Sequence, residues 1–349
     1  MLNSVNQPNG CERIEELSKI RLNMDTKRNV VVICGGDGSE YEVSLKSGKN
    51  IFEAIDSELF NKYFMILKGR DWKVIANEKE YQVDKNNFSC TIDGETIIFH
   101  FAYITIHGVP GENGLLQGYL DMMGIPYSTS NVRVEAITFD KYTCTTYLRG
   151  MGIETTKPVL LRKGEGYSID EIIEEVGLPC FVKPSGEGSS FGVTKVKTVE
   201  ALQPALELAF SKCSDVVIES FIDGTEFTCG VYKFGNKKVV FPIAEVVPKN
   251  EFFDYEAKYT TGMTDEIIPG RFTEEIAEQI QTMASNVYDI LGCSGIIRVD
   301  GFVSNGKVIM LEVNTTPGMT ANSFVPQMVR AMGTTLTQVL TNIIQDKLN

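Results

Sequence analysis

The chain has 349 residues, 43% hydrophobic and 23% charged, a composition typical of a soluble globular protein with two or three packed units. Its formal net charge of −13 argues against a nucleic-acid-binding surface, although a local cluster of lysine and arginine can still bind phosphate. No apolar run is long enough to span a bilayer, and the first 28 residues lack the apolar segment of a secretory signal. We therefore expect no membrane contact.

In chain order, the first third alternates strands with helices. We predict strands over 29–34 and 101–106 and helices over 43–55 and 115–123. This alternation is typical of an α/β layer that extends to about residue 128. Residues 1–28 are predicted to be a disordered or loosely ordered extension, and segment 70–89 carries no motif, so it is assigned no function.

Two further units follow, a central one over 129–222 and a C-terminal one over 223–349. Their predicted strands lie at 158–161, 179–183, 215–219, 226–232, 238–246, 295–303 and 308–313. Their predicted helices lie at 140–151, 198–211 and 273–291, followed by two closing helices.

The eight cysteines form no C-x-x-C pair, and several lie in apolar strand-like runs. We interpret them as buried thiols of a reducing, cytoplasmic compartment. His100 and His107 are the only histidines, so a histidine-based metal site is not expected.

Three common functional motifs are incomplete or absent. Gly36-x-Gly38 is followed by Tyr41 where a dinucleotide fingerprint needs its third glycine. The stretch 47–50 lacks the spacing of a P-loop, and no G-x-S-x-G nucleophile elbow occurs.

The strongest local signal is a pair of strands with alternating polar residues. Arg298 and Asp300 share one face of the first strand, and Glu312 and Asn314 share one face of the second. A two-residue Asn-Gly turn would place Asp300 and Glu312 on opposite faces. A three-residue loop with Gly306 in the left-handed conformation places all four on one face, and we predict that loop.

Asp300, Glu312 and Asn314 would then offer hard oxygen ligands that suit Mg²⁺, with nucleotide phosphates completing the coordination shell. Arg298 cannot bind a metal, so we expect it to face substrate or phosphate. A solvated hairpin face with cross-strand ion pairs is the alternative interpretation.

Three loops add weaker signals. Lys183 ends a buried strand before a Gly/Ser-rich loop over 184–192, which suits phosphate binding or an ordinary hairpin. The link 219–226 joins two units and could bind a nucleoside. The alternative is that its carboxylates are ordinary exposed side chains. His107 opens a loop before a helix, a common place for ligands in α/β sheets, or for a capped loop histidine.

Together these segments resemble the D-alanine–D-alanine ligases of the ATP-grasp superfamily, from about Asn29 to the C-terminus. The matching stretches are GGDGSEYEVSL (35–45), HGVPGENGLLQGYLDMMGIPY (107–127), DK (140–141), KPSGEGSSFGVTKV (183–196), FDYEAKY (253–259), GIIRVD (295–300) and LEVNTTPGMTANSFVP (311–326). With the last two stretches counted as one motif, six motifs in the right order make a chance match very unusual.

The resemblance implies an α/β (α+β) fold of three subdomains. A Rossmann-like domain over 29–128 would precede the central ATP-grasp subdomain, 129–222, and the C-terminal one, 223–349. The implied reaction uses ATP, with two Mg²⁺ (or Mn²⁺), to join two D-alanine molecules for peptidoglycan synthesis. A cytoplasmic homodimer without nucleic-acid partners is also implied.

The resemblance also implies residue roles. ATP phosphates would be held by Lys141, Lys183 and Lys258, adenine by Glu219, Phe221 and Ile222, and ribose by Glu226. The magnesium ligands would be Asp300, Glu312 and Asn314. The first D-alanine would contact Glu40 and His107, and the second Gly318 and Ser323, with Arg298 at the transferred phosphate and reacting carboxylate. A network of Glu40, Ser189 and Tyr259 would join the phosphate loop, the mobile loop and the first domain.

Several further expectations depend on this resemblance. Segment 254–265, with Gly262 as a joint, is expected to form a lid that excludes water from the acyl phosphate. Gly186 replaces a bulkier or basic residue of many relatives, which predicts a more mobile phosphate loop. Tyr259 favours an amine nucleophile, since relatives that accept D-lactate tend to replace it.

Three other functions are considered. The same scaffold could use D-lactate or D-serine as the second substrate. A nucleotide-binding regulatory protein without catalysis is a different class, although all the residues needed for chemistry are present. An NAD-linked dehydrogenase depends on the incomplete glycine fingerprint.

Overall fold

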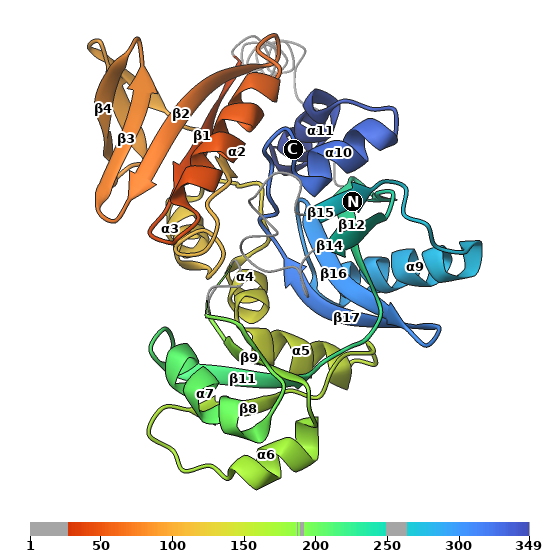
Figure 1. Cartoon of the computed structure of the whole chain (residues 1–349). Helices are drawn as coiled ribbons and strands as arrows, with labels where there is room; N and C mark the ends of the chain where they lie inside the picture. The colour runs from red at the N-terminus through yellow and green to blue at the C-terminus, as the bar shows by residue number, and fades with distance from the viewer. Residues whose placement is uncertain (1–26, 187, 189–191, 249–263, 349) are drawn as a thin grey trace, which may run out of the picture.

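The computed structural model describes residues 27–186, 188, 192–248 and 264–348. Three β-sheets, each built from its own stretch of chain, carry the helices on their faces (Figure 1). The predicted extension over 1–28 lies outside the described residues except for its last two positions. Among the described helices, none is both long and apolar enough to cross a bilayer.

The N-terminal sheet has seven strands in the order β6-β5-β4-β3-β2-β1-β7. Its parallel part consists of β1 (Arg28–Gly35), β2 (Phe60–Lys68) and β7 (Phe101–Ile104), and α2 (Tyr41–Ala54) connects β1 to β2. The run 30–33 of β1 is wholly buried, as expected for a strand covered on both faces. Helix α3 (Leu115–Met123) has the predicted bounds.

The prediction of simple strand–helix alternation was wrong for residues 71–98. This stretch forms an antiparallel meander, β3 (Asp71–Ala76), β4 (Lys79–Asp84), β5 (Ser89–Ile92) and β6 (Glu95–Ile98). Tight turns at Asn77-Glu78 and Asp93-Gly94, all with positive φ, join two of its strand pairs. Most of its outward residues are polar, so an apolar pattern of period two was hard to see.

The central sheet has four strands in the order β10-β9-β11-β8. They are β8 (Val159–Arg162), β9 (Cys180–Pro184), β10 (Thr194–Val196) and β11 (Asp215–Ser220), and all neighbours are antiparallel. Helices α6 (Ile169–Val176) and α7 (Leu202–Phe210) pack on this sheet, with a short 3₁₀ turn, η1 (Val199–Ala201), before α7. Helices α4 (Val132–Phe139) and α5 (Lys141–Gly150) instead contact the third sheet.

The third sheet follows the order β15-β14-β12-β16-β17, and β13 also pairs with β12. Its strands are β12 (Thr225–Phe234), β13 (Lys237–Val240), β14 (Ala244–Pro248), β15 (Thr264–Ile267), β16 (Ile297–Ser304) and β17 (Lys307–Asn314). The single strand predicted over 238–246 is two strands, because Pro242 lacks the N–H that a continuous ladder requires. Helix α9 (Glu274–Leu291) packs against β12, β16 and β17.

The N-terminal and C-terminal units share one hydrophobic core. Val30 and Ile51 of the first unit lie in the same buried cluster as Val325 of α10 (Phe324–Ala331) and Ile343 of α11 (Leu336–Leu348). The central sheet has a separate core beneath α6 and α7. The central sheet thus has its own core, whereas α4 and α5 of the same unit pack into the core of the third sheet.

The turn between β16 and β17 differs from the prediction. Ser304 pairs with Lys307, so the turn contains only Asn305 and Gly306, with φ of 51° and 75°. Asn-Gly tolerates this twist, which matches that of the flanking strands, so the predicted three-residue loop was wrong.

A β-bulge adds the one extra residue that we had expected in the turn. Asp300 pairs with Glu312, but Gly301 pairs with Met310, so Leu311 is the extra residue on β17. The bulge shifts the alternation of one strand by one position. Arg298 pairs with Asn314 beyond it, and the predicted shared face of the polar side chains is confirmed.

Gly301 beside this bulge is predicted to be necessary for the register. A Cβ there would lie 2.4 Å from the Ile309 carbonyl oxygen and 2.6 Å from the Phe227 ring. We expect Gly301→Ala to destabilise the protein by about 1–3 kcal/mol, measured by thermal unfolding. Gly150→Ala is the matched control, because no atom lies within 4 Å of a Cβ at that helical position. Equal melting temperatures for both variants would contradict the prediction.

Candidate active site

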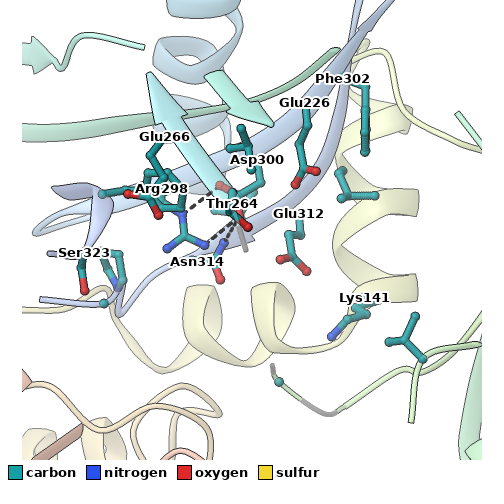
Figure 2. A pocket seen from close by; sticks show the side chains of 18 of the residues that line it. Lys141, Glu226, Thr264, Glu266, Arg298, Asp300, Phe302, Glu312, Asn314 and Ser323 are labelled. Carbon is teal, nitrogen blue, oxygen red and sulfur yellow. Dashed lines mark hydrogen bonds and ion pairs between the residues drawn. The ribbon is translucent and has the colours of Figure 1, made fainter. Parts of the chain in front are cut away.

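A cavity of roughly 1180 Å³ lies where the three units meet. Each unit contributes to its wall: Glu40 and His107 from the first, Lys141 and Lys183 from the second, and the β16–β17 hairpin from the third. Its size suits a nucleotide together with small substrates. Figure 2 shows the part of this cavity around the hairpin.

Asp300 is the centre of the hydrogen bonding on the hairpin. Arg298 donates to both of its oxygens, from Nε at 2.8 Å and Nη2 at 2.7 Å, in the bidentate geometry of strong Arg–carboxylate pairs. Thr228 of the neighbouring strand donates at 2.5 Å and the Asn314 amide at 2.9 Å. Asp300 is only 8% exposed, so these four donors replace most of its hydration.

The end of β17 is fixed by a second buried carboxylate. Glu135 of α4 is wholly buried and accepts a hydrogen bond from the hydroxyl of Thr315, the residue after Asn314. Burial raises the pKa of Glu135 well above its ordinary value, and the hydrogen bond from Thr315 opposes part of this rise. The chain therefore leaves β17 in one direction, toward the turn that carries Gly318.

The polar face of the hairpin fits a divalent cation. Glu312 and Asn314 project to the same side as Asp300, and Lys141 lies opposite Glu312 (Figure 2). Asn314 uses its amide nitrogen on Asp300, so its oxygen is the atom for a cation. The described residues contain no cluster of three His, Cys, Asp or Glu side chains that could hold a metal. A cation here thus requires the amide oxygen and ligand oxygens such as phosphate.

Across the cavity, Lys183 is held by Glu219. Its Nζ donates to the Glu219 carboxylate at 2.7 Å, and the hydroxyl of Thr156 donates to the other oxygen at 2.5 Å. Both charged side chains are largely buried. Glu219, predicted to face adenine, therefore also positions the lysine predicted to bind phosphate.

The root of the Gly/Ser-rich loop is attached to the start of α5. The Lys141 N–H donates to the Ser185 carbonyl at 3.0 Å, and the Ser185 hydroxyl donates to Asp140 at 2.7 Å. Further along this loop, a Cβ on Gly188 would lie 3.0 Å from a Glu40 carboxylate oxygen. Lys141, Lys183 and Glu40 are thus brought to the same cavity.

The predicted hinge residues follow the end of β11. Phe221 donates its backbone N–H to the Pro179 carbonyl at 3.1 Å, and its ring lies 6.2 Å from that of Phe181. Phe221, Ile222 and Glu226 all line the cavity, and Figure 2 shows the Glu226 carboxylate on the hairpin side. The two aromatic rings give this end of the cavity an apolar wall suited to a planar base.

His107 lies at the junction of the first and third units. It is 6% exposed, its Nδ1 is 3.0 Å from the Thr316 carbonyl and its Nε2 is 3.5 Å from the Ser47 hydroxyl. Burial lowers the pKa of His107, so the ring is neutral at pH 7. Its Nδ1 therefore donates to the Thr316 carbonyl, which fixes the tautomer.

Gly318 and Ser323 come together at the start of α10. A Cβ on Gly318 would lie 3.1 Å from the Ser323 hydroxyl, and that hydroxyl accepts from the Thr320 N–H at 3.1 Å. Ser323 occupies the N-cap position of α10 without capping it through its side chain. Gly318, Thr320, Ala321, Asn322 and Ser323 of this turn line the cavity.

Three predicted residues, Ser189, Lys258 and Tyr259, lie outside the described residues, as does most of the predicted lid over 254–265. Sequence reasoning also missed residues that line or order the site: Glu112, Thr156, Thr228 and Glu266. Thr228 had a usable signal, since Glu226 and Thr228 are two apart on one strand and so share a face. The partner of Thr156 comes from a distant strand and that of Glu266 from a distant helix, which no local pattern shows.

This architecture and this site define an ATP-dependent ligase of the ATP-grasp class. Residues 29–130 match the family model described as D-ala D-ala ligase N-terminus, and residues 148–345 match D-ala D-ala ligase C-terminus. A D-alanine–D-alanine ligase of Bacteroides fragilis is 53% identical over 323 residues, which cover 92% of this chain and 99% of the relative. The chain belongs to the D-alanine–D-alanine ligase family.

Solved structures agree with this assignment. The VanG D-Ala:D-Ser ligase from Enterococcus faecalis matches with a TM-score of 0.82 and 31% identity, covering 92% of this chain and 99% of that one. The D-alanine–D-alanine ligase from Bacillus anthracis complexed with ATP matches with a TM-score of 0.75 and 33% identity, covering 93% and 98%. The sequence-based fold prediction is confirmed.

Glu112 gives a prediction about pH. Burial, helped by the nearby Glu40, raises the pKa of Glu112 to about 8, from an ordinary value of 4.5. The folded state thus favours the protonated acid, so its contribution is fully present below pH 4.5 and declines as the pH rises toward 8. We expect Glu112→Gln, which keeps an acceptor for the Gly108 N–H, to flatten this decline in melting temperature between pH 5 and pH 9. If the melting temperatures of wild type and variant fell in parallel across this pH range, the raised pKa of Glu112 would be contradicted.

Proposed function

We propose that this chain joins two D-alanine molecules into D-alanyl-D-alanine, with ATP as the phosphoryl donor, for peptidoglycan precursor synthesis in the cytoplasm. One observation carries the proposal: Arg298, Asp300, Glu312 and Asn314 share one face of the β16–β17 hairpin. That face lines the same cavity as Lys141 and Lys183. Relatives that bear the name D-alanine–D-alanine ligase cover nearly the whole chain.

ATP would lie between the central and C-terminal units. Its adenine would pack against Phe221 and Ile222 of the hinge and the ring of Phe181, with Glu226 accepting hydrogen bonds from the ribose hydroxyls. Lys141 and Lys183 would contact the phosphates, and Glu219 would keep Lys183 in place through its ion pair. Lys258 would add a further cation to the γ-phosphate.

Magnesium would be held by Asp300, Glu312 and Asn314, whose oxygens suit a hard cation. Two such ions would reduce the repulsion between the γ-phosphate and the substrate carboxylate. Arg298 would add to this by binding the transferred phosphate while Asp300 fixes its guanidinium group. These residues prepare the carboxylate of the first D-alanine to become an acyl phosphate.

The first D-alanine would lie beside Glu40 and His107. Glu40 would bind its ammonium, and His107 would contact it from its fixed position beside the Thr316 carbonyl. The network of Glu40, Ser189 and Tyr259 would close the site over the acyl phosphate and exclude water.

The second D-alanine would lie against Gly318 and Ser323. The Ser323 hydroxyl would bind the carboxylate of this D-alanine. Its ammonium would lose a proton, and the resulting amine would attack the acyl phosphate carbonyl as the bond to phosphate breaks. The tetrahedral oxyanion would be stabilised by Arg298 and the Gly318 N–H. We further propose that the chain acts as a homodimer, as the resemblance implies.

A D-Ala:D-Ser ligase has the same fold at 31% identity, so D-serine is the second candidate acceptor. Phosphate release measured with D-alanine alone, and with D-alanine plus D-serine or D-lactate, separates these activities. If D-alanine alone yields no dipeptide at neutral pH, the substrate assignment is wrong.

Arg298→Ala is predicted to lower turnover by about 10²- to 10³-fold, because it removes a donor at the developing charge. Coupled phosphate release with D-alanine measures the effect. Since Asp300 keeps donors from Thr228 and Asn314, the fold should persist, which circular dichroism checks. Turnover equal to that of the wild type would remove Arg298 from the mechanism.

Removing divalent cations with EDTA is predicted to abolish phosphate release, and added Mg²⁺ or Mn²⁺ to restore it. Glu312→Gln should raise the Mg²⁺ concentration needed for half-maximal rate, because an amide is a weaker ligand than a carboxylate. Glu278→Gln is the control, since this exposed glutamate lies on α9, away from the cavity. Full turnover in EDTA would refute the proposed metal site.

A further inference from the structure

Glu266 is a carboxylate of the cavity to which the proposed mechanism assigns no role. It lies on β15, is half-buried and accepts a hydrogen bond from the Gln327 amide. Gln327 lies one turn after Ser323 in α10, and its N–H donates to the Ser323 carbonyl at 3.2 Å. Its amide also donates to the Asn322 carbonyl at 2.7 Å. Glu266 is therefore attached to the same turn of helix that carries the proposed carboxylate site.

Arg298, Glu266 and Ser323 all lie at the same end of the cavity (Figure 2). Burial raises the pKa of Glu266, while the Gln327 amide and the charge of Arg298 lower it. A cation that binds beside Glu266 would stabilise its ionised carboxylate.

The second substrate supplies such a cation. An α-amino acid carries a carboxylate and an ammonium on the same carbon, so a site for it needs a donor region and an acceptor region a few ångströms apart. Ser323, Gly318 and Arg298 provide the donors. Glu266 provides a carboxylate acceptor at the same end of the cavity.

The other carboxylates of the cavity have partners or positions elsewhere. Glu245 is held by Arg271 in a bidentate pair, at 2.9 Å from Nε and 2.6 Å from Nη2. The remaining acids lie at the hinge, on the metal-binding face or in the first unit: Glu219, Asp223, Glu226, Asp300, Glu312, Glu40 and Glu112. Glu266 is joined through Gln327 to α10, the helix that begins directly after Ser323.

We propose that Glu266 binds the ammonium group of the second amino acid and thereby selects amino acids over hydroxy acids as acceptors. The inference rests on the proposed function and deepens it. D-Lactate has a hydroxyl in place of the ammonium, so it forms no ion pair with Glu266. D-Serine has the same ammonium as D-alanine, so Glu266 does not distinguish between these two.

Glu266→Gln tests the proposal, because glutamine has the same shape and keeps an oxygen to accept from Gln327. We expect the KM for the second D-alanine to rise about tenfold or more, with the KM for the first D-alanine and kcat within about twofold. The ratio of D-alanyl-D-lactate to D-alanyl-D-alanine formed from mixed acceptors should rise by a similar factor. Unchanged second-site KM and unchanged acceptor ratio would overturn the inference.

Asp265→Asn is the matched control. It removes the same charge from the adjacent residue of β15, whose exposed side chain points to the opposite face of the strand. We expect its acceptor ratio and both KM values to stay at wild-type levels. An equal effect in both variants would show that net charge, and not contact with the ammonium, sets the preference.

Hydroxylamine separates this inference from the proposed function. Its nitrogen attacks the acyl phosphate carbonyl and releases phosphate, which gives D-alanyl hydroxamate without a second amino acid. We expect equal hydroxamate rates for wild type and Glu266→Gln. If wild type forms neither hydroxamate nor dipeptide, the proposed function fails. If the variant loses both activities equally, or melts well below wild type, Glu266 has a structural role and the inference fails.

Discussion

The site depends on one buried carboxylate, Asp300, and on the donors that surround it. An ionised carboxylate with little exposure is costly unless hydrogen bonds replace its hydration. Arg298, Thr228 and Asn314 do so from three different strands, β16, β12 and β17. Their convergence requires the register of all three strands to be correct at once. A change of register in the third sheet would therefore also disrupt the active site.

The sequence predicted this face but not the way in which the chain makes it. Alternation of Arg298 with Asp300, and of Glu312 with Asn314, is visible because a strand has a period of two. The parity between the strands depends on the turn and on any bulge. Asn305-Gly306 is the strongest sequence signal for a two-residue turn, and Gly301 within a strand is a signal for a bulge. Taking both signals together would have given the observed register.

Other parts of the site could not be inferred from local pattern. The pair of Lys183 with Glu219 joins neighbouring strands of the central sheet, and Thr156 adds a partner from a loop 63 residues away. Glu266 and Gln327 are 61 residues apart. Such contacts are set by how the units pack, whereas the apolar runs of β1, β9 and β11 could be predicted since burial shows directly in composition. The meander over 71–98 was missed because its exposed face hides that pattern.

Lys183 and Arg298, two cations of the cavity, are each held by an acid of the protein itself. Lys183 is paired with Glu219 and Arg298 with Asp300, so a phosphate that binds to either cation must compete with a carboxylate already in place. Among the described residues that line the cavity, acidic side chains also outnumber basic ones. An anionic nucleotide would thus meet a surface of the same sign unless divalent cations enter with it. The magnesium ions of the proposed mechanism would therefore be needed for binding as well as for phosphoryl transfer, because the protein supplies more negative charge than positive at this site.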